Sequence, residues 1–120
     1  MTNNFPTMDK DIFKDLTEIL GDEIYDLLNE FLQDTPPQFA LLSEAISASA
    51  FKDIFTLAHS QTSASGNLGL TKFQYLSQSI CIKAKDENIQ ACTELYNALL
   101  ENFKECEILL TQIIDQHSLL

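Results

Sequence analysis

The chain has 120 residues, which is the size of one domain, and 45% of them are hydrophobic, which is enough to form a buried core. Its formal net charge is −11 and its seven basic residues are all lysines, so binding to nucleic acid or to an anionic membrane surface is disfavoured. Three cysteines without Cys-x-x-Cys spacing indicate buried free thiols rather than a metal site.

Helix-forming residues dominate the chain, and only three glycines and three prolines interrupt them, so we expect an all-α fold. Apolar positions at helical spacing predict a short first helix at residues 8–20. Gly21 is expected to stop this helix, and Asp22 to act as the N-cap of a long second helix at residues 22–47.

The second helix contains Pro36 and Pro37, which lack a backbone N–H donor, so we expect either a kink there or two helices that share a corner. Three more helices are expected, at residues 50–66, 71–84 and 87–117. Thr71 and Gln74 have the spacing of a capping box at the start of the fourth helix. Asp86 is the expected N-cap of the fifth helix.

In the last helix, apolar residues alternate at spacings of three and four, which is typical of left-handed bundles. The sequence therefore predicts an antiparallel four-helix bundle in one domain of residues 1–120, with the short N-terminal helix packed across one end. Residues 1–6 are expected to be flexible and residues 118–120 frayed. Because no apolar run is long enough to span a membrane and residues 1–10 lack the apolar core of a signal peptide, a cytoplasmic location is expected.

His59 lies in the middle of the third helix and is the main candidate for chemistry. At about 100° per residue, its face of the helix contains Lys52, Phe55, Thr62, Ser63 and Gly66. The opposite face, which should turn to the core, holds Ile54, Leu57, Gln61, Ala64 and Leu68. Gln61 is unusual there, because a buried amide needs hydrogen-bond partners. Either it lies near a helix end or contacts water, or the core face is rotated slightly from this assignment.

An exposed imidazole is largely neutral at physiological pH, and its lone pair makes it a nucleophile that can accept and release a phosphoryl group. Small neighbours such as Ser63 and Gly66 would let another protein approach closely. Thr62 could donate a hydrogen bond to the phosphate, Lys52 could supply a cation, and Phe55 could form the apolar part of a docking patch. The alternative is a surface histidine without a role, which helix geometry alone does not exclude.

The segment around this histidine resembles the signature of histidine-containing phosphotransfer (HPt) domains, Ala-His-x-Leu-Lys-Gly-Ser-x-x-x-Leu-Gly. The residues that fit the pattern are Ala58, His59, Asn67, Leu68 and Gly69. Residues 19–22 and 31–36 are similar to the early helices of the same family, and the resemblance extends over nearly the whole chain. It implies an HPt-like helical bundle.

The resemblance also implies a function, that of a phosphocarrier in a two-component phosphorelay without its own kinase activity. His59 would accept a phosphoryl group from the aspartyl phosphate of a receiver domain, in a response regulator or a hybrid histidine kinase, and pass it to another receiver. The protein would need no cofactor, since Mg²⁺ is expected on the receiver, and it would act as a monomer. Gln78, on the fourth helix, is a further candidate to reach the histidine.

The chain also departs from the family pattern. Residues 61–64 read Gln-Thr-Ser-Ala where the family usually has Leu-Lys-Gly-Ser, and Cys81 stands where the family often has Glu. The missing lysine removes the cation usually found beside the phosphohistidine. The alternative function is therefore a non-phosphorylated module of the same fold that docks or sequesters receiver domains. His117, near the C-terminus, is interpreted as structural or solvated.

Overall fold

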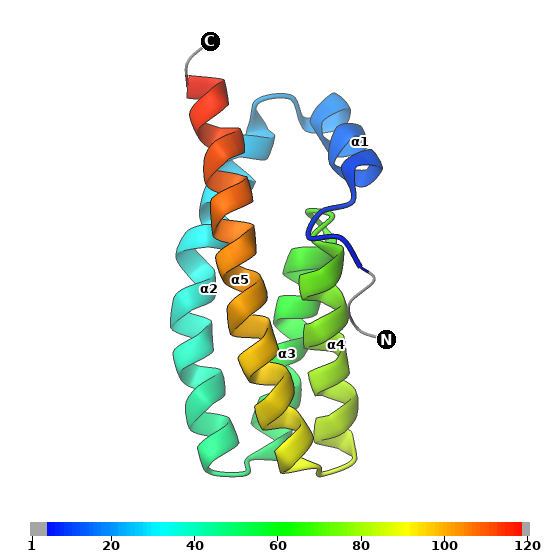
Figure 1. The fold of residues 1–120 in the computed structure, drawn as a ribbon, viewed down its shortest axis with the longest axis vertical. Coiled ribbons are helices and arrows are strands. Elements are labelled where there is room, and N and C mark those ends of the chain that lie inside the picture. The colour runs from blue at the N-terminus through cyan, green and yellow to red at the C-terminus, as the bar shows by residue number, and fades with distance from the viewer. Residues whose placement is uncertain (1–4, 119–120) are drawn as a thin grey trace.

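The computed structural model describes residues 5–118, which form five helices (Figure 1). They are α1 (Lys10–Leu20), α2 (Glu23–Ser47), α3 (Phe51–Gly66), α4 (Thr71–Lys85) and α5 (Ile89–Ser118). All five expected helices are confirmed, and the part of the chain described contains no strand. The expected boundaries are accurate to within two residues at every helix end, because helical periodicity and the turn residues between helices are local signals.

Helices α2 to α5 form an antiparallel bundle, and α1 packs across one end of it (Figure 1). In this bundle α2 packs on α3 and α5, while α4 packs on α3 and α5, so the four helices close a ring around one core. Four phenylalanines meet at its centre, with ring centroids 5.3 to 6.4 Å apart. They are Phe31 and Phe39 from α2, Phe73 from α4 and Phe103 from α5. All three cysteines are free thiols and buried, as expected.

The long helix α2 continues through both prolines, so the expected alternative of two separate helices is wrong. Pro36 and Pro37 lie on the exposed side of α2. Helices tolerate an interior proline at a cost of about 3 kcal/mol, and packing of the apolar stripe of α2 on the rest of the bundle offsets that cost. The hydroxyl of the buried Thr35 donates to the Phe31 carbonyl at 2.6 Å, directly before the prolines.

Two of the expected caps are wrong. The Thr71 hydroxyl donates to the Pro6 carbonyl at 2.9 Å instead of capping α4, so no capping box forms with Gln74. Asp86 ends α4, and the cap of α5 is Asn88, whose Oδ1 accepts from the Ala91 backbone N–H at 3.0 Å. Side-chain caps compete with tertiary partners and with neighbouring candidates, so spacing alone does not choose between them.

The expected helix end at Gly21 is confirmed, whereas the expected N-cap at Asp22 is confirmed only in position. Gly21 follows α1 with a φ of 57°, and its N–H donates to the Thr17 carbonyl, as expected of a C-terminal glycine. Asp22 occupies the N-cap position of α2, but its side chain accepts no capping hydrogen bond. At the start of α1, by contrast, Asp9 forms a side-chain cap, and its Oδ1 accepts from the Asp11 and Ile12 backbone N–H groups.

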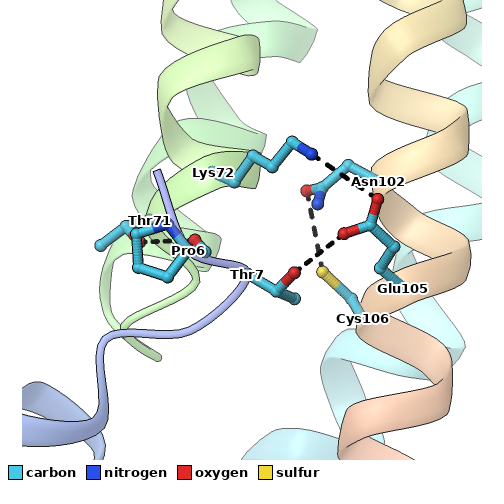
Figure 2. Close-up of polar contacts among 7 residues, drawn as sticks. All are labelled: Pro6, Thr7, Thr71, Lys72, Asn102, Glu105 and Cys106. Atoms are coloured by element: carbon cyan, nitrogen blue, oxygen red, sulfur yellow. Dashed lines mark hydrogen bonds and ion pairs between the residues drawn. The ribbon is translucent and has the colours of Figure 1, made fainter. Parts of the chain in front are cut away.

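Figure 2 shows how the segment before α1 is held against the bundle. The Pro6 carbonyl accepts from Thr71, and the Thr7 hydroxyl donates to Glu105 of α5 at 2.9 Å. Lys72 lies 3.6 Å from the same Glu105 carboxylate, so one acidic side chain ties the segment and α4 to α5. Residues 5 and 6 both contact residues of α4, and residues 1–4 of the segment expected to be flexible lie outside the described residues.

At the other end of the chain, α5 extends to Ser118, and residues 119 and 120 of the expected frayed end lie outside the described residues. His117 is half-buried and stacks on Tyr25 of α2, with ring centroids 3.7 Å apart and an interplanar angle of 14°. This contact agrees with a structural interpretation of His117. None of the described helices combines the length and the apolar character needed to cross a membrane.

Candidate functional site

His59 is exposed on α3, as its position in the sequence predicts. The buried residues of α3 are Ile54, Ala58, Gln61 and Ser65. The core face is thus turned slightly from the expected one, since Leu57 is only half-buried and Ala64 is exposed. The buried face of α3 is rotated because α4 packs on the side of α3 that carries Phe55, Thr62 and Gly66. Small side chains between α3 and α4 allow this close approach.

His59 borders a depression of about 280 Å³ between α3 and α4. Its lining residues are Phe55, His59, Thr62, Gln78, Cys81, Ile82 and Lys85. Three of the expected site residues, Phe55, Thr62 and Gln78, are therefore brought together with the histidine. Gln78 is exposed, so its amide can turn toward the rim of the depression.

Lys85 and Ile82 are the lining residues that sequence reasoning did not name, and Lys85 is the charged one. Its Nζ lies 5.0 Å from the centroid of the Phe55 ring, a cation–π contact, and Phe55 in turn stacks on His59 with centroids 5.8 Å apart and an angle of 6°. Lys85 thus brings a cation from α4 to the depression that His59 borders, although α3 lacks the lysine that the family pattern has after the histidine. The helical spacing of Gln78, Cys81 and Lys85 on one face of α4 is the signal that could have found it.

The His59 ring is open to chemistry in the plane of its nitrogens. Within residues 5–118 no hydrogen bond or ion pair engages the ring. The stacked Phe55 covers one face of the imidazole, but the nitrogen lone pairs lie in the ring plane and are not blocked by a stacked neighbour. The ring therefore keeps a free nitrogen for a visiting group.

Thr62 and Gly66 have roles inside the bundle. The Thr62 hydroxyl lies 2.9 Å from both the Ala58 carbonyl and Ser77 Oγ, so its single proton is shared between partners within the protein. It can donate to a phosphate only if it turns away from them. A Cβ at Gly66 would lie 2.5 Å from Nε2 of Gln74, so the space beside this glycine is filled by α4 rather than left for a partner.

The remaining expected residues lie at the edge of the site. Ser63 is exposed, as close approach of another protein requires. Lys52 does not line the depression that contains His59, but it lies beside a shallower one of about 240 Å³, lined also by Phe55 and Lys85. Two lysines, one from each helix, therefore flank Phe55.

Cys81 is the other potential nucleophile beside His59. Burial raises the pKa of its thiol above the ordinary value of 9.0, while the neighbouring Thr62 hydroxyl and the Lys85 charge lower it in part. The Sγ atom donates to the Phe55 carbonyl at 3.7 Å. The thiol is therefore protonated at neutral pH and does not compete with the imidazole. No group of three potential metal ligands occurs among the residues that the structure describes.

Comparison with known proteins agrees with this geometry. The family model of the Hpt domain matches residues 26–116, which include most of the chain and His59. The chain belongs to the Hpt domain family. It is a phosphotransfer domain of a class that typically lacks kinase activity.

Among solved structures, the Hpt domain resembles the crystal structure of histidine-containing phosphotransfer protein B (HptB) from Pseudomonas aeruginosa PAO1. The TM-score is 0.89 at 23% sequence identity, and the match covers 92% of this chain and 96% of the other. At this identity the likeness shows the fold, an all-α bundle. No curated protein sequence matches the chain.

Proposed function

We propose that His59 is the phosphoacceptor of this Hpt domain and carries a phosphoryl group between receiver domains. The observation that supports it best is the exposed imidazole, which makes no hydrogen bond or ion pair within residues 5–118, with Phe55 stacked on it and the Lys85 ammonium in contact with the Phe55 ring. An exposed nucleophile that shares a depression with a cation suits an anionic group delivered by another protein.

The transfer is a displacement at phosphorus. The lone pair of the neutral imidazole attacks the phosphorus of an aspartyl phosphate on the receiver, and an N–P bond forms as the P–O bond to the aspartate breaks. The aspartate carboxylate leaves with the electron pair, while the proton on the second ring nitrogen stays in place. The attacking atom would be Nε2, the outer nitrogen of the ring. The reverse steps deliver the group to the aspartate of another receiver.

The residues around His59 would divide the work. Lys85 can swing from Phe55 to the phosphoryl oxygens and replace the lysine that the family usually has on the helix of the histidine. Gln78 can donate a hydrogen bond from its amide. Mg²⁺ would be held by the receiver, and this chain would contribute the nucleophile and the docking surface.

The docking surface would be centred on the exposed side of α3 and the adjoining part of α4. Ile82 borders the depression beside His59 and is a large apolar side chain that is 54% exposed. Together with Phe55 it offers an apolar patch next to the nucleophile, while Ser63 keeps the approach open. Hpt domains in general interact with receiver domains, so such a domain is the partner proposed here.

The test is to incubate the protein with a receiver domain carrying radiolabelled aspartyl phosphate and to measure acid-labile, base-stable label. The expected result is label on the wild type and none on His59→Gln. The matched control is His117→Gln, since the chain has two histidines and this variant should keep the label. Label that persists on His59→Gln contradicts the proposal, and receiver binding without label on the wild type supports the non-phosphorylated module instead.

A further inference from the structure

Gln61 is the buried residue that the fold leaves unexplained. Its side chain is 2% exposed, and neither its amide nitrogen nor its amide oxygen has a hydrogen-bond partner among the described residues. The HPt signature has leucine at this position, so an apolar residue would fill the space without this cost. Buried amides are normally paired because an unpaired one is costly, and an unpaired one points to a missing partner group.

A groove between α2 and α3 contains this residue. It has a volume of about 240 Å³, smaller than the pockets of drug-sized ligands and suited to a single side chain. Its apolar walls include Leu27, Phe31 and Leu68, and Leu27 is 36% exposed at the rim. The groove shares no residue with the depression beside His59, because the two lie on opposite flanks of α3.

The charged residues that line the groove are both acidic. Glu30 and Asp34 lie one helical turn apart on α2, both exposed, and no basic residue lines the groove. Neither carboxylate takes part in a hydrogen bond or ion pair within residues 5–118. Two free carboxylates above apolar walls favour a long side chain with a cationic end.

We propose that this groove binds an arginine side chain of the protein that docks at His59. The aliphatic stem would lie against Leu27 and Phe31, and the guanidinium would donate to the carboxylates of Glu30 and Asp34 and to the Gln61 amide oxygen. Gln61 would turn into the groove to reach it, since its amide atoms are closed off in the free protein. Arginine fits better than lysine because its planar group offers five donors in a fixed arrangement.

The position of the groove agrees with such a role. Gln61 and Ala64 follow His59 on the same helix, and Ala64 and Asn67 are exposed along the rim. Ser63 and Ala64 are neighbouring exposed positions that connect the surface around His59 with this rim, so a protein that docks at His59 and extends along the exposed side of α3 would reach the groove. That the arginine belongs to a receiver domain rests on the proposed function, whereas the recognition of a guanidinium by the groove does not.

The groove is tested first without any partner protein. Nα-acetyl-L-argininamide is titrated into the full chain, and amide NMR spectra follow the Gln61 side-chain NH₂ signal and the backbone signals of Ala64 and Asn67. Saturable shifts in the millimolar range are expected, with binding at least about tenfold weaker for the citrulline analogue, which has the same length and no charge. Absence of saturable shifts, or equal binding of both compounds, overturns the proposal.

Variants then locate the binding. Glu30→Gln combined with Asp34→Asn should abolish the shifts, and Gln61→Leu should do so without altering the charge. The matched control is Asp11→Asn combined with Asp15→Asn, which removes two exposed charges at the same spacing from α1 and should leave the titration unchanged. Equal loss in the control pair would mean that net charge alone attracts the probe, and the groove would be excluded.

The partner is tested with a receiver domain that labels His59. The charge variant at Glu30 and Asp34 should raise the dissociation constant of that receiver about tenfold, while the transfer rate at saturating receiver stays the same. An unchanged dissociation constant would overturn the assignment to the docking partner. If the wild type accepts no label, the proposed function fails, but the titration with the arginine derivative still decides whether the groove exists as a binding site.

Discussion

Replacing Gln61 by leucine should stabilise the protein, which is the opposite of what most core substitutions do. The side chain is buried between α2 and α3, and both polar atoms of its amide lack hydrogen-bond partners within residues 5–118. Leucine has a similar volume and no polar atoms, so it removes the cost of the buried amide and fills the same space.

The size of the effect follows from two opposing contributions. Burial of an unpaired amide costs about 1–3 kcal/mol in protein mutational data. The different shape of the branched side chain costs up to about 1.5 kcal/mol in a packed core. With the middle of each range, the net gain should be about 1 kcal/mol in the free energy of unfolding, which is a rise in Tm of roughly 4 °C for a domain of this size.

Urea unfolding followed by circular dichroism measures this gain as a shift in the midpoint at constant m-value. The control is Gln33→Leu, an exposed position on the same helix as the groove wall, where the change should stay within about 0.5 kcal/mol. A Gln61→Leu variant that is no more stable than the wild type would refute the reasoning, because it would mean that the amide is already satisfied in the free protein.

Three further predictions follow from the same structure. Lys85→Ala should lower the equilibrium constant for phosphoryl transfer from the receiver to His59 about fivefold, and by a smaller factor at high salt. Lys83→Ala, outside the depression, should leave this constant unchanged, and equal effects of the two substitutions would show that Lys85 does not act on the phosphoryl group. Burial raises the pKa of the Cys106 thiol from 9.0 to about 12, so the unfolded chain loses this proton first and stability should fall between these pH values by up to about 1.4 kcal/mol per pH unit. Urea titrations between these pH values should show that the unfolding free energy of Cys106→Ala falls less steeply with pH than that of the wild type. Equal slopes for the two proteins would contradict the raised pKa of Cys106. Asn88→Ala should cost about 1 kcal/mol of unfolding free energy because it removes the cap of α5, while Asp86→Ala should cost little. A larger loss of stability for Asp86→Ala than for Asn88→Ala would mean that Asp86 caps α5, as the sequence predicts.

The sequence alone determined the helices and the exposure of His59. Apolar spacing, the glycine after α1 and the turn residues are local signals, and they placed every helix end within two residues of its observed position. Helical geometry also fixed the direction of the histidine, since a residue on the side away from the apolar stripe must face solvent. Even the anomaly of Gln61 was visible as an amide on an apolar face.

The tertiary structure alone decided what surrounds the histidine. Lys85 reaches Phe55 from another helix, and Gln74 fills the space beside Gly66 that the sequence suggested was open. The Thr62 hydroxyl hydrogen-bonds to Ser77, and the Thr71 hydroxyl donates to the Pro6 carbonyl instead of capping α4. Each of these contacts depends on how far neighbouring helices are rotated and shifted along one another. Periodicity within one helix carries no information on that rotation and shift, because they are set by the packing of all the side chains between the helices.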